Sequence, residues 1–557
     1  MKRLLLLEII LIGVVFTLLF IVNNKSTIRT TESVLSRFEK KPFTCIVGII
    51  VIAIVLRILC LGFFPAPQPV IPDEFSYLLA ADTFSMGRLG NPTHAHWEFF
   101  ESFHINQIPT YASMYPPAQG LVLAAGQAVT GNPWFSVLIS TAVMCGILCW
   151  MLQGWLPFRW ALIGGLIAVV RISLFSYWGN TYWGGSVAAI GGLLVLGGIP
   201  RIMKRNSSVL TFFVLALGIL ILANSRPYEG LVLCFAATLA GLTTYLTSRR
   251  SFAKLLTAKW LVVVFTLLVG LAAMGFYNRR VTGAFSVMPY QVNQQQYAMA
   301  KPFLWQTPST NVEYRHEVMK NMYAHYYFMA RSARSSLTGL LDSAIQKLAT
   351  IWLFFIAPVL SVPMIALPKS IFDRRIRFMV LTGMFAIPGI FAETWFHAHY
   401  AAPFVGITYV LVLQSLRHIR CSRVLARRTR RAIFLTVPTV TILMTVFAVV
   451  TFPPAAQGRD YGTWCCNPNG PSTRSQVIDR LRASGGLHLV FVEYTKDHNM
   501  HEEWVYNAAD IDGSPIVFAR DMGLTKNSQL IQYFSGRHVW HLVVGDGPIK
   551  LEPYAMR

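Results

Sequence analysis

The sequence predicts an α-helical polytopic membrane protein with about 11–13 transmembrane segments and a small C-terminal α/β domain outside the cytoplasm. Hydrophobic residues make up 54% of the 557 positions and charged residues only 13%, whereas a soluble domain is about 25% charged. Apolar runs recur up to residue 451, and short basic loops separate several of them. Beyond residue 452 the pattern changes to alternating short helices and strands.

The charge distribution orients these segments. The formal net charge is +23, and many Lys and Arg residues lie in short loops at 201–205, 249–259, 368–377 and 417–431. Basic loops of this kind are typical of the cytoplasmic side of a membrane protein. No nucleic-acid recognition motif or continuous basic face accompanies the charge, so we expect no nucleic-acid partner.

Residues 1–43 are predicted to form a membrane anchor and a cytoplasmic linker. The run Leu4–Val22 has no small-residue cleavage site and carries Glu8, which favours a retained helix over a cleaved signal sequence. The linker after it is basic and is therefore expected in the cytoplasm. The next run, Cys45–Phe64, would then cross outward.

Residues 44–451 form the predicted transmembrane domain, with outer loops at 65–117 and 278–344. Several apolar segments in it are shorter than the roughly 20 residues that a crossing needs. Counting crossings from the two ends gives answers that differ by one, so we expect one segment between 118 and 200 to be re-entrant or broken. Glu313–Leu348 has the pattern of one amphipathic helix along the outer membrane surface.

Residues 452–557 are predicted to form the extracytoplasmic α/β domain, which has no phosphate-loop or dinucleotide fingerprint. The expected elements are two helices and three buried strands, at Thr473–Ala483, Leu487–Tyr494, Pro515–Ala519, Asn527–Phe534 and His538–Val544 in chain order.

The pair Asp73-Glu74 is the best candidate for chemistry. It follows Pro72 directly after an outward span. Two acidic residues at a helix start complement the helix dipole, so the pair could be purely structural. Alternatively, one carboxylate acts as a general base that activates an acceptor hydroxyl or amine.

The same outer loop carries several histidines. His94 and His96 could bind a divalent cation with nearby carboxylates, although two histidines one residue apart in a loop are more often solvated or hydrogen-bonded. His104 and Tyr115, the latter followed by Pro116-Pro117, are candidate substrate contacts. The sequence requires no cofactor, and it does not identify a metal site.

Arginines on the predicted outer side need an anionic partner, because they run against the positive-inside trend. Arg226 lies in the break Ser225-Arg226-Pro227, close to Glu229, and Arg279-Arg280 ends an outward span. A lipid-linked phosphate would suit their guanidinium groups. An ion pair between Arg226 and Glu229, and headgroup contacts for Arg279 and Arg280, are the alternatives.

A polar interruption at an outer membrane edge, 393–400, holds His397 and His399 beside Glu393. Such groups in an apolar context are costly unless they are used or paired. Substrate contact is one explanation for them, and interface anchoring by Trp395 and Tyr400 is the other.

Together these motifs resemble the GT-C superfamily of membrane glycosyltransferases. The resemblance covers residues 44–420 and is nearest to the branch of protein O-mannosyltransferases and lipid A aminoarabinose transferases. It is carried by the outward span before Asp73-Glu74, by Tyr115-Pro116-Pro117, by Ser225-Arg226-Pro227, and by His399-Tyr400 with Pro403. The additional N-terminal span departs from the family.

The resemblance implies sugar transfer from a polyprenyl-phosphate donor to a glycan, lipid or protein acceptor at the periplasmic side of a bacterial inner membrane. In that family an acidic residue of the first outer loop acts as base, which maps onto Asp73 with Glu74 beside it. Basic residues of the outer loops hold the donor phosphate, for which Arg226, Arg279 and Arg280 are the candidates; Glu229, His104, Tyr115, His397 and His399 are candidate substrate contacts. A lipid-linked substrate transporter or flippase, or a non-catalytic assembly protein for envelope polysaccharide, remains the alternative.

Overall fold

The computed structural model describes residues 2–22, 41–203, 207–248, 257–451, 462–465, 472–545 and 547–555. The predicted cytoplasmic linker at 23–40, the basic residues at 204–206 and 249–256, and the start of the C-terminal region at 452–461 lie outside the described residues.

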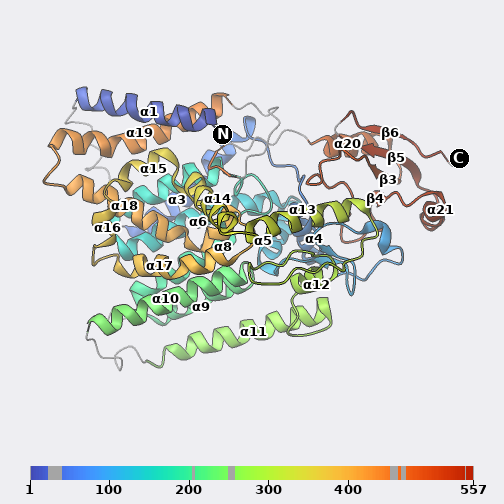
Figure 1. Cartoon of the computed structure of the whole chain (residues 1–557), viewed down its shortest axis with the longest axis horizontal. Coiled ribbons are helices and arrows are strands. Elements are labelled where there is room, and N and C mark those ends of the chain that lie inside the picture. Colours follow the sequence, from blue (N-terminus) through green and yellow to red (C-terminus); the bar gives the residue numbers. More distant parts are fainter. Residues whose placement is uncertain are drawn as a thin grey trace.

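The chain is an α-helical membrane protein with a small C-terminal sheet domain, as the sequence predicts. Within the described residues, eight helical stretches are long and apolar enough to cross a membrane: Arg3–Val22, Pro42–Gly62, Trp134–Trp155, Pro227–Thr247, Trp260–Thr282, Leu337–Met364, Ala398–Cys421 and Arg427–Thr451. Three shorter apolar helices join them, α8 (Ser186–Ile202), α9 (Val209–Ala223) and α17 (Arg377–Ala392). Figure 1 shows these helices side by side in one bundle.

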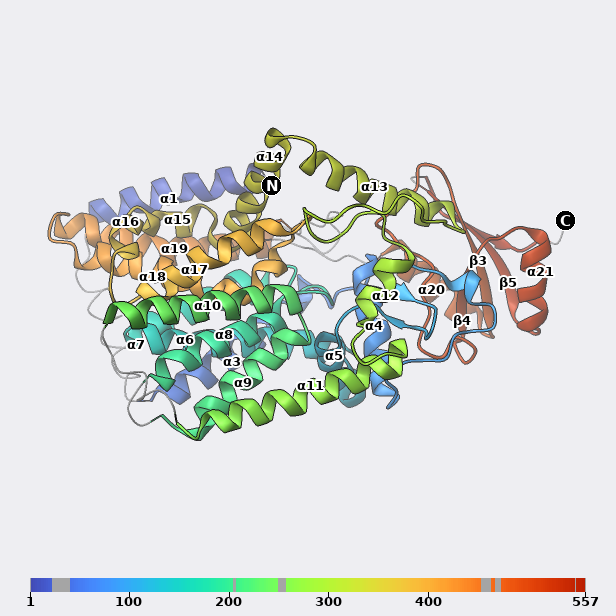
Figure 2. The same cartoon turned by 60° about the horizontal axis from the view of Figure 1, so that its bottom comes forward.

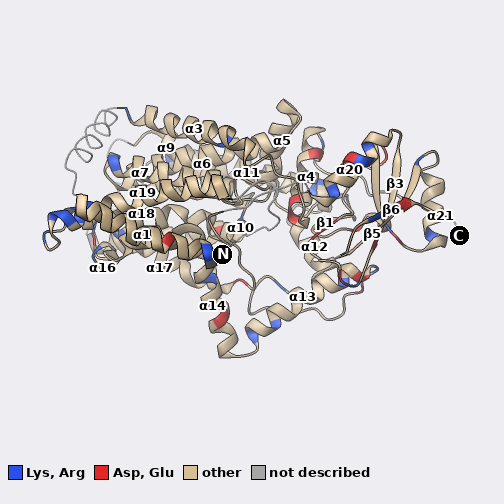
Figure 3. Ribbon diagram, turned by 90° about the horizontal axis from the view of Figure 1, so that it is seen from above, with Lys and Arg blue, Asp and Glu red and all other residues tan. Residues whose placement is uncertain are grey.

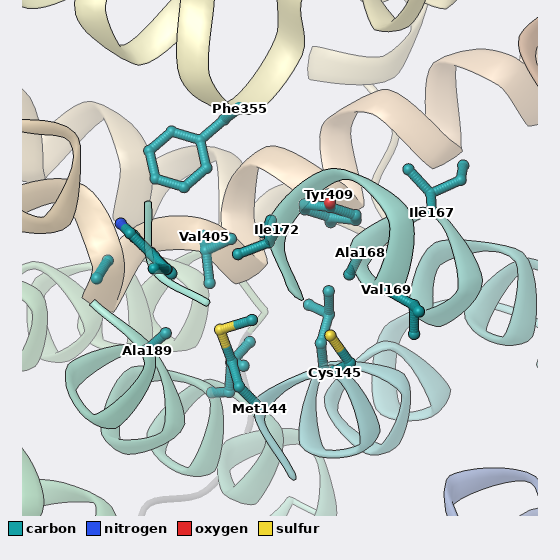
Figure 4. Packing of buried hydrophobic residues seen from close by; sticks show 14 of the residues in the cluster. Met144, Cys145, Ile167, Ala168, Val169, Ile172, Ala189, Phe355, Val405 and Tyr409 are labelled. Carbon is teal, nitrogen blue, oxygen red and sulfur yellow. The ribbon is translucent and has the colours of Figure 1, made fainter. Parts of the chain in front are cut away.

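The centre of the bundle is formed by α6 (Trp134–Trp155), α8 and α18 (Val405–Cys421), whose residues are mostly buried. In Figure 4, Met144 and Cys145 of α6 lie close to Ala189 of α8 and to Val405 and Tyr409 of α18. At the closest helix approach, a Cβ on Gly192 would lie 2.2 Å from the carbonyl oxygen of Pro403. The glycines of α8 therefore serve helix packing. By contrast, α1 (Lys2–Val22) and α11 (Trp260–Thr282) keep most of their apolar side chains exposed, as lipid-facing helices do.

One segment between 118 and 200 is interrupted, as expected. Helix α7 (Phe158–Ala168) passes into a π-helical turn, η3 (Val169–Leu174), and the chain then runs irregularly through 175–185, where nearly every residue is buried. Asn180 satisfies this backbone by donating to the carbonyls of Leu174 and Ser176, both at 2.9 Å, and by accepting from Arg57. Irregular buried backbone is tolerated when protein groups satisfy it in this way.

The region between the bundle and the C-terminal domain is built from α4 (Pro72–Ser85), a two-stranded ribbon of β1 (Ile105–Asn106) and β2 (Ala112–Ser113), α5 (Pro117–Thr130) and α12 (Pro289–Gln296). The expected single helix over Glu313–Leu348 is two helices, α13 (Glu317–Arg334) and α14 (Leu337–Ile351). The break arises at Ser336, whose hydroxyl caps α14 by accepting from the backbone N–H of Gly339. Figure 2 shows α4, α5 and α12 between the bundle and the C-terminal domain.

The C-terminal domain contains the predicted helices α20 (Thr473–Ser484) and α21 (Leu524–Tyr533) and the strands β3 (His488–Tyr494), β4 (Ile516–Arg520) and β5 (His538–Val544). A fourth strand, β6 (Lys550–Pro553), completes a sheet of order β4-β3-β5-β6, in which only β6 is antiparallel. Figure 3 shows basic residues concentrated beyond α18 and α19 (Arg427–Thr451), at the end of the bundle opposite this domain.

Candidate active site

A cavity of about 480 Å³ lies among the elements between the bundle and the C-terminal domain. Its lining comes from the start of α4, the residues just before β1 and just after β2, the α9–α10 junction, α12 with the segment after it, α13, and residues 393–400. Helix α10 spans Pro227–Ser248. Six of the residues predicted from sequence line this cavity: Asp73, His104, Tyr115, Arg226, Glu229 and His397.

Asp73 occupies the first turn of α4, where Pro72 begins the helix and the dipole favours a negative charge. The hydroxyl of Tyr115 donates to its Oδ1. The Nδ1 of His104 lies 3.6 Å from its Oδ2 and 3.3 Å from the Tyr115 hydroxyl. One carboxylate oxygen is thus held by Tyr115, while the other lies 3.6 Å from His104 Nδ1.

The surroundings fix the protonation of these neighbours. Burial raises the pKa of Tyr115, and the charge of Asp73 raises it further, so the phenol stays protonated and acts as a donor. Burial lowers the pKa of His104, although Asp73 opposes the shift. His104 adopts a left-handed backbone with φ of 59°, and its carbonyl accepts from Ser76 and from the N–H of Met114. A strained residue held in this way beside a reactive group is typical of functional sites.

Glu74 has a different position from Asp73. Its Oε2 accepts from the backbone N–H groups of Val70 and Ile71 at 2.9 and 3.3 Å, and its Oε1 accepts from that of Tyr182 at 3.3 Å. The side chain is fully buried and is not part of the cavity lining. The helix-start explanation therefore accounts for the contacts of Glu74.

Arg226 follows the end of α9 and lines the cavity. Its guanidinium lies 3.5 Å from Glu229 Oε1 and stacks on the ring of Tyr400 with 4.4 Å to the ring centroid. The ion pair foreseen from sequence is present, and it leaves Arg226 at the cavity wall. Both side chains are mostly buried, with exposures of 17% and 9%.

Arg279 and Arg280 are exposed at the end of α11 and do not line the cavity. Arg279 lies over the ring of Phe285 at 4.9 Å. His399 is also outside the lining; it is buried, and the hydroxyl of Tyr177 lies 2.8 Å from its Nδ1. His397, in contrast, lines the cavity beside Trp183 and His399.

The other predicted histidines are engaged in the protein. His94 Nε2 contacts Asp512 Oδ1 of the C-terminal domain at 3.0 Å, and His94 Nδ1 accepts from the backbone N–H of His96. Both ring nitrogens of His94 are therefore used, which supports the hydrogen-bonded explanation over a metal site at His94 and His96.

Lys301 was missed as a site candidate, whereas Glu393 was noted beside His397 and His399. Lys301 lies in the loop after α12, where a lysine on the predicted outer side was the available signal. Glu393 is only 6% exposed, and its Oε2 has no hydrogen-bond partner. Burial and then the charge of Glu229 raise the pKa of Glu393 well above its ordinary range. In the described lining, Arg226 and Lys301 are the permanently cationic side chains.

Comparison with solved structures identifies the fold. ArnT from Cupriavidus metallidurans in the apo state superposes with a TM-score of 0.51 at 12% identity, covering 90% of this chain and 93% of that chain. The chain has the GT-C fold. ArnT bound to undecaprenyl phosphate gives a TM-score of 0.50 at the same identity and coverage. An oligosaccharyltransferase from Archaeoglobus fulgidus gives 0.40 at 10% identity, over 90% of this chain and 67% of that chain.

No protein-family model and no curated protein sequence matches the chain. The fold that the resemblance implies is confirmed by the superposition on ArnT. Within this fold, the cavity combines a carboxylate held by a hydrogen bond with two cations.

Proposed function

We propose that this chain is a glycosyltransferase that moves a sugar from a polyprenyl-phosphate donor to an acceptor of the cell envelope. The observation that carries the proposal is that one cavity contains Asp73, Arg226 and Lys301. A base and phosphate-binding cations are the two requirements of such a transfer, and no nucleotide-sugar domain is needed for it.

The reaction follows from these groups. An acceptor hydroxyl or amine attacks the anomeric carbon, Asp73 takes its proton, and the bond between that carbon and the phosphate oxygen breaks. Arg226 and Lys301 stabilise the negative charge that develops on the departing polyprenyl phosphate. Tyr115, by donating to one oxygen of Asp73, holds the carboxylate in a fixed orientation.

The position of the cavity suits a lipid-anchored donor. Arg226 immediately precedes Pro227, where a candidate membrane span begins. A polyprenyl phosphate keeps its phosphate near the bilayer surface, so cations at the end of a span lie at the right depth. One solved ArnT structure contains undecaprenyl phosphate, which supports this class of donor. Arg279 and Arg280 remain proposed contacts to the same phosphate from outside the cavity.

We place the cavity and the C-terminal domain on the periplasmic side of a bacterial inner membrane. Basic residues gather at the opposite end of the bundle, which is the cytoplasmic end under the positive-inside rule. The partners we propose are the lipid-linked sugar, the bilayer and a glycan, lipid or protein acceptor, and the cavity chemistry calls for no further cofactor. Glu229, His104 and His397 are proposed substrate contacts, since each lines the cavity.

The test is sugar transfer by the purified full-length chain, with polyprenyl-phosphate sugars as donors. Asp73→Asn keeps the shape of the side chain and its acceptor for Tyr115 but removes the base, so we expect transfer to fall by about 10²–10⁴-fold. Asp479→Asn is the matched control, because Asp479 is 74% exposed on α20, outside the cavity, and pairs with Arg482 at 3.9 Å.

Retained transfer in Asp73→Asn would remove Asp73 as the base. If the wild-type chain binds polyprenyl phosphate but transfers no sugar from any donor, the transporter or assembly functions would replace this proposal.

A further inference from the structure

Three side chains converge on one face of the C-terminal sheet, outside the cavity. Glu493 lies near the end of β3, Asp521 directly follows β4, and His541 lies on β5. In the sheet register, His541 is opposite Phe491 and Arg520 is opposite Val492. Because side chains alternate between faces along a strand, Glu493, Asp521 and His541 all project from the same face.

The distances between their ligand atoms match a metal site. His541 Nε2 lies 3.0 Å from Glu493 Oε2 and 3.5 Å from Asp521 Oδ2, and the three atoms are all within 4.8 Å of one another. Zinc bonds nitrogen and oxygen ligands at about 2.0–2.2 Å in tetrahedral geometry, which sets ligand atoms about 3.3–3.5 Å apart. The two closer separations lie around that value.

Asp521 is oriented as a ligand by its own partners. Its Oδ1 accepts from the backbone N–H of Gly523 and from the side-chain amide of Asn527, both at 2.9 Å. These two bonds fix the carboxylate and direct Oδ2 toward His541. Hydrogen bonds that orient the ligands in this way are a regular feature of protein metal sites.

The topology places the cluster where open α/β sheets bind ligands. The first strand, β3, is central; the chain continues to β4 on one side and then returns through α21 to β5 on the other. The connection from β3 to β4 and the connection from β4 to β5 therefore run in opposite directions along the sheet, and the direction changes between β3 and β5. In open α/β sheets, ligands bind beyond the carboxyl ends of the strands at such a point. Glu493 lies near the carboxyl end of β3 and Asp521 directly follows the carboxyl end of β4.

We infer that Glu493, Asp521 and His541 form a binding site for a divalent transition-metal ion, with zinc as the best match. An imidazole ligand favours zinc over magnesium or calcium, and two carboxylates neutralise the charge of the ion. The side chain of Glu493 is 56% exposed, so the three protein ligands leave the fourth position open toward solvent, where an oxygen atom of water or of a second molecule binds.

The experiment measures Zn²⁺ binding to the purified full-length chain by equilibrium dialysis and by thermal unfolding. We expect Glu493→Gln to bind one equivalent of Zn²⁺ less than the wild type and to lose the Zn²⁺-dependent rise in Tm. Asp521→Asn keeps an oxygen acceptor for Gly523 and should behave in the same way. His538→Ala is the control, since His538 is an exposed histidine on the same strand outside the cluster, and it should match the wild type.

Glu493 is solvent-exposed, so its replacement by glutamine tests binding without loss of the fold. Equal Zn²⁺ stoichiometry in the wild type and in Glu493→Gln would overturn the site. So would a wild-type chain that binds no Zn²⁺, which would leave the cluster as contacts between His541 and the two carboxylates. Neither result depends on sugar transfer.

Discussion

Arg226 has two roles that one pair of substitutions can separate. It neutralises Glu229 in the cavity wall, and we propose that it binds the donor phosphate. Arg226→Met removes the charge but keeps much of the side-chain volume. It leaves the Glu229 carboxyl without its cationic partner and only 9% exposed, and breaking a buried pair by removing one partner costs about 3–5 kcal/mol.

The double variant Arg226→Met/Glu229→Gln also replaces the carboxyl that Arg226→Met leaves without a partner. Because replacing a whole buried ion pair is often nearly neutral, the double variant should regain most of the stability that Arg226→Met loses. The donor affinity should not return. A hydrogen bond to a charged group contributes about 1.5–3 kcal/mol, which corresponds to about 10- to 150-fold weaker binding of polyprenyl phosphate.

The assays are Tm by thermal unfolding and the Kd for polyprenyl phosphate, measured for the wild type, Arg226→Met, Glu229→Gln and the double variant. Glu229→Gln keeps the arginine and should retain donor affinity. If the double variant recovers donor affinity together with stability, Arg226 is a structural partner of Glu229 and not a phosphate ligand.

Three further predictions test the roles of individual residues. Glu74→Ala removes the acceptor of three backbone N–H groups, so the protein should be destabilised by about 1–3 kcal/mol and its Tm should fall. Its sugar-transfer activity per folded molecule should change far less than that of Asp73→Asn. A loss of activity as large as in Asp73→Asn would make Glu74 catalytic. Lys301→Ala should weaken polyprenyl-phosphate binding more than Arg279→Ala, since only Lys301 lines the cavity; the reverse order would move the phosphate site to the end of α11. Burial lowers the pKa of His104, so below about pH 6.5 the unfolded chain binds a proton that the folded chain does not, and acidification destabilises the wild type. His104→Gln lacks this group and should therefore show a shallower fall in Tm between pH 7 and pH 5. The same fall in Tm in both proteins would contradict this role of His104.

The sequence predicted those parts of the fold that depend on local patterns. Apolar runs located the helices of the bundle, and short runs rich in apolar residues located β3, β4 and β5. Strand β6 was missed because Lys550–Pro553 is a short, mostly exposed edge strand without an apolar alternation. The break before α14 was also missed, although Ser335-Ser336 is a capping signal that competes with a continuous helix.

The candidate site was predicted only in part, because its geometry depends on contacts between distant segments. Asp73 and Tyr115 stand out locally, one by its helix start and the other before a proline pair. Lys301 reaches the cavity because its loop pairs with the segment after α17: Thr394 donates its backbone N–H to the carbonyl of Pro302 at 2.8 Å, and Leu304 donates to Ala392 at 3.0 Å. Nothing in the spacing of residues almost a hundred positions apart could indicate that pairing.

The C-terminal domain bears directly on the placement of Asp73. Tyr506 stacks on Phe75 with 4.6 Å between ring centroids, two residues from Asp73 on the same helix. At the other end of α4, Asp82 accepts from the backbone N–H of Ala509 at 2.6 Å. The domain also binds the segment that holds the β1–β2 ribbon, since Arg520 donates to the carbonyl of Glu101 and Tyr111 donates to that of Asn507.

Both ends of α4 are therefore fixed by the same domain, while Glu74 fixes the backbone that leads into the helix. A general base must be held close to its productive position, because small displacements of a reacting group greatly reduce the rate. Apart from this domain, α4 packs mainly on α5 and β2, and Glu74 accepts from the backbone N–H of Tyr182. The sheet domain thus holds the helix that carries Asp73, the base that we propose for the transfer.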